Sequence, residues 1–266
     1  MNRESPIGVF DSGVGGLTVL RALHDRLPNE RTVYLGDTAR VPYGTKSPAV
    51  VERYALANAR FLEAQGVKLL VVACNTASAE SMPALAAALS IPSLGVIVPG
   101  ARAAAARTKG RVLILGTPGT IASGAYQRAL AAHAPGLEVV ARACPLFVPL
   151  AEEGWTDGDV PRLVAERYLA DLRGRVDTAV LGCTHYPLLA GASASVLGPD
   201  VALVDSAGAA AAAVASLLSE RDLARTETSP PDRRYFVTDV PAAFERVAAR
   251  FLGHAPERAE QVDILV

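Results

Sequence analysis

Several residue types are scarce in this sequence, and each scarcity excludes a class of protein. Only three cysteines occur in 266 residues, at positions 74, 144 and 183, which is too few and too widely spaced for a disulfide framework. The first residues lack the basic and then apolar pattern of a signal peptide, so we expect a cytoplasmic protein. No apolar run reaches the roughly 20 residues that cross a bilayer, so we expect no membrane partner.

An excess of basic charge is also missing. The chain has 26 Lys and Arg against 27 Asp and Glu, giving a formal net charge of −1. Because phosphate binding needs clustered basic residues, we expect no nucleic-acid partner. Aromatic residues make up 5% and hydrophobic residues 50%, a composition typical of a folded protein with a sizeable core. The length allows one large α/β unit or two modest domains.

Two short apolar segments, residues 69–74 and 178–183, each end in a cysteine. Such runs predict strands that are buried on both faces of a parallel sheet. Asn75 and Thr76 follow the first cysteine, and Thr184 and His185 follow the second. Because ligands bind at the carboxyl edge of open α/β sheets, the matching positions predict a pair of facing thiols.

Strand and helix patterns alternate along the chain, and a second series repeats the first after a little over a hundred residues. This order predicts an α/β fold of two pseudo-symmetric three-layer lobes with mainly parallel sheets and a cleft between them. We expect the helix after Cys74 to start late or kink at Pro83, and the helix near Pro161 to be capped by Asp159. We expect extended chain at 91–98, a loop at 145–149, a buried core helix from Ala207 and a last extended segment at 262–266.

A glycine-rich turn at 11–16 joins the first strand to a helix. A dinucleotide fingerprint starting at Gly13 would need a third glycine where the chain has Thr18, so that interpretation fails. The turn offers an acid, a hydroxyl and free backbone N–H groups at a helix start. These groups suit a small zwitterion that carries a carboxylate.

Three other chemistries fit the residues less well. Zinc is improbable because Cys183 and His185 are too close in sequence for a typical ligand pair, so we expect no metal. His185 could activate a thiol for acyl transfer, which would leave the second cysteine without a role. Pyridoxal phosphate needs a Schiff-base lysine, and Lys46, Lys68 and Lys109 lie in a loop or before strands. We therefore expect no cofactor.

Two equivalent thiols suit proton transfer at one carbon from opposite faces. One thiolate removes a proton while a thiol on the other side delivers one, which inverts the carbon. The thiol pKa, about 8.5 when unperturbed, must then lie near the working pH, and we expect a strand-end, helix-start position to lower it. Asp11 and His185 would assist the two thiols, one in each half.

Four segments, residues 10–18, 36–44, 72–77 and 181–187, resemble in sequence and order the motifs of bacterial glutamate racemases, in the aspartate/glutamate racemase superfamily. The resemblance implies cofactor-independent interconversion of L- and D-glutamate for peptidoglycan synthesis. It implies a first lobe at 1–98 completed by 208–266, a second lobe at 99–207, substrate between the lobes, and a homodimer.

The same resemblance implies the site residues. Cys74 and Cys183 become the two acid/base residues, with Asp11 and His185 assisting catalysis. The implied substrate contacts are Asp11, Ser12, Tyr43, Gly44, Asn75, Thr76, Thr117, Thr120, Glu152, Thr184 and His185. Two alternatives stay open: a racemase for aspartate or another amino acid, and a non-catalytic protein of the same fold that binds an acidic amino acid.

Overall fold

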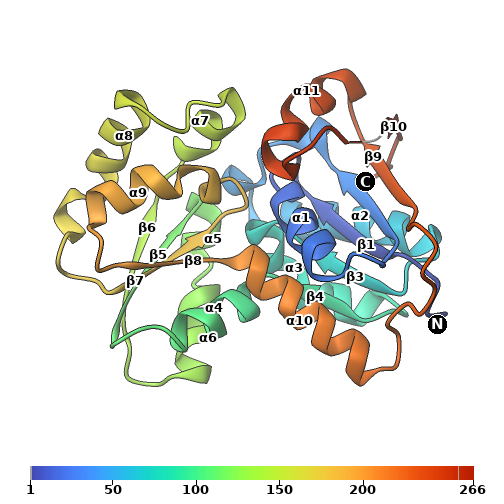
Figure 1. Cartoon of the computed structure of the whole chain (residues 1–266), viewed down its shortest axis with the longest axis horizontal. Coiled ribbons are helices and arrows are strands. Elements are labelled where there is room, and N and C mark those ends of the chain that lie inside the picture. The colour runs from blue at the N-terminus through green and yellow to red at the C-terminus, as the bar shows by residue number, and fades with distance from the viewer. Residues whose placement is uncertain (1, 257) are drawn as a thin grey trace.

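The computed structural model describes residues 2–256 and 258–266, and these form two lobes that each contain one sheet (Figure 1). The strands of the first sheet are β1 (Ile7–Asp11), β2 (Thr32–Gly36), β3 (Leu69–Val72), β4 (Ser93–Gly95), β9 (Arg233–Val237) and β10 (Ala259–Gln261). Those of the second are β5 (Arg111–Gly116), β6 (Glu138–Ala143), β7 (Thr178–Gly182) and β8 (Ala202–Asp205). All paired strands are parallel, which confirms the predicted α/β class.

Helices connect the strands as crossovers. They are α1 (Leu17–Arg26), α2 (Pro48–Ala64), α3 (Asn75–Ala88), α4 (Ile97–Ala105), α5 (Pro118–Ala122), α6 (Ala125–His133), α7 (Phe147–Glu153), α8 (Asp159–Leu169), α9 (Ala190–Leu197), α10 (Ser206–Glu220) and α11 (Pro241–Leu252). Short 3₁₀ turns are η1 (Thr38–Arg40), η2 (Tyr43–Thr45), η3 (Ala170–Leu172) and η4 (Tyr186–Leu189). Within the described ranges, no helix is both long and apolar enough to cross a membrane.

The two sheets repeat one strand order. The first sheet runs β10-β9-β2-β1-β3-β4 and the second runs β6-β5-β7-β8, so β1 and β5 hold equivalent central places. Phe10 of β1 pairs with Val72 of β3, and Leu115 of β5 pairs with Leu181 of β7. The predicted internal repeat is therefore present in the fold, and it places β3 and β7 in corresponding positions.

The chain returns to the first lobe after β8. Helix α10 packs on both α1 and α4, where its small alanine side chains permit close helix contact (Figure 1). Ala210, Ala211 and Val214 are buried, in agreement with a core helix. Strands β9 and β10 then extend the first sheet, and both chain ends lie in the first lobe. The boundaries 1–98 with 208–266 and 99–207 stay predictions.

Two segments that were expected to be non-helical contain helices. Strand β4 covers only 93–95 and α4 begins at Ile97, whereas extended chain was expected at 91–98. Helix α7 occupies most of the expected loop at 145–149. In the sequence, the prolines Pro99 and Pro149 indicate non-helical chain. Each lies in the first turn of its helix, where the missing N–H would have had no intrahelical partner.

Three helix and strand ends also differ from expectation. Helix α3 does not start late, because the Cys74 side chain caps it and the helix continues through Pro83, and the alternative of a kink at Pro83 stays a prediction. Gly158 rather than Asp159 is the residue before α8, and Asp159 lies in the first turn instead. The last strand is 259–261 rather than 262–266, because that is where the backbone pairs with β9.

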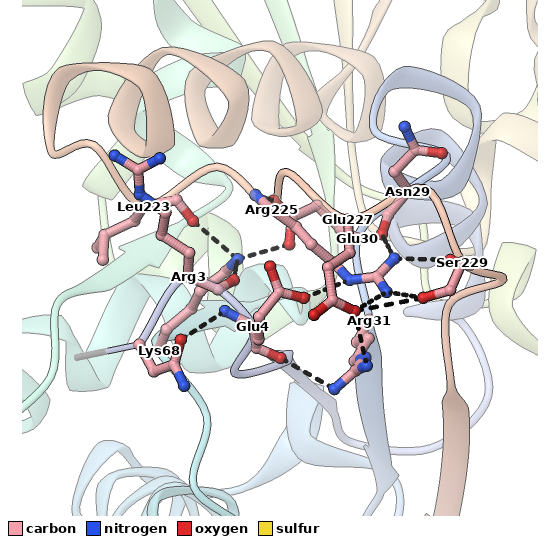
Figure 2. A network of polar contacts seen from close by, with 11 residues as sticks. Arg3, Glu4, Asn29, Glu30, Arg31, Lys68, Leu223, Arg225, Glu227 and Ser229 are labelled. Atoms are coloured by element: carbon pink, nitrogen blue, oxygen red, sulfur yellow. Dashed lines mark hydrogen bonds and ion pairs between the residues drawn. The ribbon is translucent and has the colours of Figure 1, made fainter.

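A buried lysine holds the returning chain against the first sheet (Figure 2). Lys68, just before β3, has a fully buried side chain, and its Nζ donates to Glu30 Oε2 at 2.6 Å. The same nitrogen donates to the backbone oxygens of Arg3 at 2.6 Å and Leu223 at 2.8 Å. All three hydrogens of the ammonium are therefore used, as a buried charge requires.

Arg225 extends this network. Its backbone N–H donates to Glu30 Oε1 at 2.8 Å, so both oxygens of that carboxylate are bonded. Its guanidinium donates to Glu4 Oε2 at 2.8 Å. Glu30 and Lys68 precede β2 and β3, so the network lies at the amino edge of the sheet, away from the cysteines. It fastens the segment after α10 to the first lobe.

We expect Lys68→Met to destabilise the protein by about 3–5 kcal/mol, because it leaves the buried Glu30 carboxylate without its cation. Urea unfolding followed by circular dichroism measures the loss. Arg162→Met is the control, because its ion pairs with Asp159 and Glu166 are exposed and should leave the free energy of unfolding nearly unchanged. Equal stability of the two variants would contradict the prediction.

Candidate active site

Both predicted thiols line one small cavity of about 50 Å³. Cys74 follows β3 of the first lobe and Cys183 follows β7 of the second. The wall also contains most of the other predicted residues: Ser12, Tyr43, Gly44, Asn75, Thr76, Thr117, Glu152, Thr184 and His185. A larger hollow of about 810 Å³ between α3, α4, α6 and α10 contains neither thiol. The duplicated strand ends therefore bring the candidate chemistry to one place.

Two predicted residues do not form part of the wall. Asp11 is fully buried behind it, next to Gly16, where an added Cβ would lie 2.4 Å from the Asp11 Cβ. Thr120 lies behind two wall residues. Its hydroxyl is 3.1 Å from Thr76 Oγ1 and 3.0 Å from Thr117 Oγ1. Thr76 and Thr117 are themselves 2.9 Å apart, so three hydroxyls join α3 of the first lobe to α5 of the second.

Glycines in the first turn allow the two lobes to approach closely. A Cβ added at Gly15 would lie 2.3 Å from Thr184 Oγ1 and 2.5 Å from His185 Nδ1. Thr18, which excluded a dinucleotide motif, donates its hydroxyl to the backbone oxygen of Thr184 at 3.1 Å. The glycine-rich turn therefore packs against the end of the second cysteine strand.

The first thiol lies in an acidic and buried environment. Burial raises the pKa of Cys74 to about 12, and the negative charge of Asp11 adds to this effect. The N–H of Ala77 at 3.5 Å and the hydroxyl of Ser12 act in the opposite direction but are outweighed. The prediction that a helix start lowers this thiol pKa is therefore wrong for Cys74, because desolvation exceeds the helix contribution.

Asp11 has one oxygen bonded and one free. Its Oδ2 accepts the N–H of Gly13 at 2.9 Å, and the structure gives its Oδ1 no hydrogen-bond partner among the described residues. Burial raises the pKa of the carboxyl group, against the charge of His185 and the backbone N–H groups of the turn. A buried acceptor of this kind suits a bound cation.

The second thiol belongs to a chain of contacts that reaches solvent. Cys183 Sγ lies 3.8 Å from His185 Nδ1, and His185 Nε2 lies 2.9 Å from Glu152 Oε1. Burial lowers the pKa of His185, but its hydrogen bonds with Cys183 and Glu152 raise the net value to about 10. The Glu152 side chain is 44% exposed. Cys183 is followed by the 3₁₀ turn η4 rather than by an α-helix, so only Cys74 has the expected helix-start position.

A buried carboxylate arranges the loop that carries Tyr43 and Gly44. Asp37 is fully buried and accepts from the Tyr43 hydroxyl, from Asn58 Nδ2 at 3.3 Å and from Arg40 at 2.6 Å. Gly44 presses against the second lobe, since an added Cβ would lie 2.6 Å from Thr117 Cβ. Asp37 is not part of the cavity wall and holds this loop in place.

Apolar residues complete the wall, and no sequence pattern identified them. Val41 and Pro42 come from the loop after β2, and Val148 comes from α7. Single apolar residues in loops are common, so no pattern distinguishes these three. They add apolar surface to the wall beside the thiols. Among residues 2–256 and 258–266, no three His, Cys, Asp or Glu side chains are grouped so that they could hold a metal ion.

Comparisons with known proteins agree with this geometry. The profile of the Asp/Glu/Hydantoin racemase family matches residues 8–214. A glutamate racemase from Geobacter metallireducens is 59% identical over 249 residues, which cover 93% of this chain and 92% of that protein.

Solved structures give the same result for the fold. The crystal structure of glutamate racemase from Francisella tularensis in complex with D-glutamate superposes with a TM-score of 0.92, 40% identity and 98% coverage of both chains. An aspartate racemase from Picrophilus torridus is only 20% identical, with a TM-score of 0.58 over 84% of this chain, and shares the fold alone.

The charge on His185 should stabilise the fold in a pH-dependent manner. Its folded-state pKa of about 10 exceeds the ordinary value of 6.5, so this contribution is complete below about pH 6.5 and is lost as the pH rises through about 10. His185→Asn should therefore lower Tm more at pH 6.5 than above pH 10, as measured by thermal unfolding.

His24 is the matched control for this pH dependence. Burial lowers the pKa of His24 to about 3, so this ring is neutral throughout the range. His24→Asn should lower Tm slightly less at pH 6.5 than above pH 10, because the unfolded imidazole binds a proton near pH 6.5, and this direction is opposite to that expected for His185→Asn. An equal change at both pH values for His185→Asn would contradict a raised pKa at that position.

Proposed function

This chain belongs to the Asp/Glu/Hydantoin racemase family, and we propose that it interconverts L-glutamate and D-glutamate without a cofactor. One observation carries the proposal: two thiols from equivalent strand ends of opposite lobes line the same cavity. A racemase must act on both faces of Cα. Two chemically alike groups on separate lobes meet that requirement.

The proposed reaction is a two-base proton transfer. In one direction the Cys74 thiolate takes the proton from Cα, so the C–H bond breaks, an S–H bond forms and the electron pair remains on carbon. The Cys183 thiol then gives its proton to the opposite face of the planar carbanion, which inverts the centre. The reverse direction exchanges the two roles, and glutamate is neither oxidised nor reduced.

Unpaired polar atoms around the thiols support a zwitterionic substrate. Asn75 Nδ2 is a buried donor and Asp11 Oδ1 a buried acceptor, each without a protein partner among the described residues. We propose that Asn75 Nδ2 faces the carboxylate of glutamate, and that the buried Asp11 carboxylate attracts the ammonium group from behind the cavity wall. A bound ammonium would also favour the Cys74 thiolate, which burial disfavours.

His185 and Asp11 assist the two thiols in this proposal. His185 hydrogen-bonds Cys183 Sγ on one side and Glu152 on the other, which fixes the ring and gives it a route to solvent. Ser12, Tyr43, Gly44, Thr76, Thr117, Thr120 and Thr184 complete the proposed substrate site together with Asn75 and Glu152. Thr120 acts through the hydroxyls of Thr76 and Thr117.

Glutamate is favoured over the alternatives kept open by the sequence. One methylene changes binding in a pocket by only about 1–3 kcal/mol, so pocket chemistry alone discriminates weakly between glutamate and aspartate. The 59% identity to a glutamate racemase over most of both chains supports glutamate. The presence of both thiols in one cavity favours a catalyst over a protein that only binds an acidic amino acid.

The test is incubation of the protein with L-glutamate in D₂O. We expect the circular dichroism of the solution to fall to zero while deuterium enters Cα, because each inversion exchanges that hydrogen with a thiol. L-aspartate under the same conditions should exchange about 10–200-fold more slowly, the effect of one methylene. If the folded protein introduces no deuterium at Cα of glutamate, the proposal is wrong.

Both single variants, Cys74→Ser and Cys183→Ser, should lose at least about 100-fold in racemisation rate in both directions. Each turnover uses both groups, and a serine hydroxyl is far less acidic than a thiol. Cys144→Ser is the matched control, because that buried thiol lies outside the cavity wall. Normal racemisation by either site variant would remove its cysteine from the mechanism.

We further propose that the protein supplies D-glutamate for peptidoglycan in the cytoplasm and works as a homodimer. The family resemblance supports these statements. We expect sedimentation to give about twice the chain mass of 27.7 kDa. A sedimenting mass that stays at one chain across the concentration range would contradict the dimer.

A further inference from the structure

A tyrosine from the second lobe bonds to an active-site residue of the first. Tyr126, on α6, donates its hydroxyl to Asn75 Oδ1 at 2.7 Å. Asn75 is the first residue of α3 and directly follows Cys74. Tyr126 is fully buried, and Asn75 is only 2% exposed. This contact crosses between the lobes beside the proposed base.

Glycines create the space that Tyr126 occupies. A Cβ added at Gly182, the residue before Cys183, would lie 2.9 Å from Tyr126 Cε2. A Cβ added at Gly100 would lie 3.2 Å from the Tyr126 hydroxyl. The ring is therefore held between α4 and the end of β7, and it has little freedom to move away from Asn75.

The hydrogen bond determines which end of the Asn75 amide is free. Burial raises the pKa of Tyr126 above its ordinary value, so the phenol stays protonated and can donate a hydrogen bond. In the structure it donates to Oδ1, the acceptor end of the amide. This leaves Nδ2, which is buried and has no protein partner among the described residues, although Asn75 lines the cavity.

We propose that Tyr126 is a positioning residue that orients Asn75 so that its NH₂ group faces a carboxylate oxygen of the substrate. The inference rests on the proposed function, since it needs an anionic substrate in this cavity. Without the phenol hydroxyl, the amide can rotate by 180° and present Oδ1, an acceptor, to the carboxylate. Tyr126 thus acts on the substrate only through Asn75, from the opposite lobe.

The test is Tyr126→Phe, which removes one oxygen and keeps the ring. We expect KM to rise about tenfold for both enantiomers, the cost of one buried hydrogen bond, with a much smaller change in kcat. The carboxylate is charged in both the bound substrate and the transition state, so this contact contributes mainly to binding. Racemisation is followed by circular dichroism, and thermal unfolding verifies that the variant is folded.

Tyr186→Phe is the matched control. It removes an equally buried hydroxyl, which donates to the backbone oxygen of Cys144 at 2.8 Å outside the cavity wall. We expect its KM to remain that of the wild type. An unchanged KM for Tyr126→Phe, or an equal rise for both tyrosine variants, would overturn the positioning role.

Asn75→Ala provides a second and independent route, including for the case that Tyr126→Phe does not fold. It leaves Tyr126 in place, and its KM should rise at least as much as that of Tyr126→Phe. Combining the two substitutions should add no further rise, because Tyr126 acts through Asn75. Additive effects, or a wild-type KM for Asn75→Ala, would overturn the inference while the proposed function stands. A wild-type protein that does not racemise glutamate would overturn both.

Discussion

Parallel strand pairing is the constraint on which the site depends. In each sheet the central strand, β1 or β5, is flanked in the same order by strands that run in the same direction. All these strands therefore end at one edge, and the residues that follow them must meet there. Because β3 and β7 hold equivalent places, Cys74 and Cys183 become corresponding residues of two lobes. The duplication of the fold thus places the two thiols on separate lobes, as the proposed inversion at Cα requires.

Because the lobes are in close contact, the two corresponding cysteines line the same cavity. Gly15 and Gly44 lack side chains at the points where each would collide with the second lobe, at Thr184 and at Thr117. Hydroxyls and an amide then bridge the lobes around the thiols. At the opposite edge of the first sheet, the buried pair of Lys68 and Glu30 fastens the returning chain. The first sheet therefore carries Cys74 at its carboxyl edge and is stabilised by this buried ion pair at its amino edge.

The chemistry of the site is set by burial as much as by residue type. Cys74 lies at a helix start, yet its pKa rises because it is desolvated beside Asp11. His185 is buried too, but two hydrogen-bonding partners raise its pKa instead of letting it fall. In both cases the direction of the pKa shift depends on burial and on residues that are distant in sequence. The two thiols are equivalent in topology and different in surroundings.

The sequence by itself determined the alternation of strands and helices, the internal repeat and the two cysteine-bearing strand ends. Apolar runs and small-residue turns are local signals, and they follow directly from side-chain burial and backbone freedom. It did not determine the helices around Pro99 and Pro149, because a proline is compatible with either a loop or a first helical turn. Only the tertiary structure placed Glu152 on His185, removed Asp11 from the cavity wall, and brought Tyr126 to Asn75 across the lobes. Those contacts join residues far apart in the chain, and no local pattern encodes which distant side chain will complete a buried hydrogen bond.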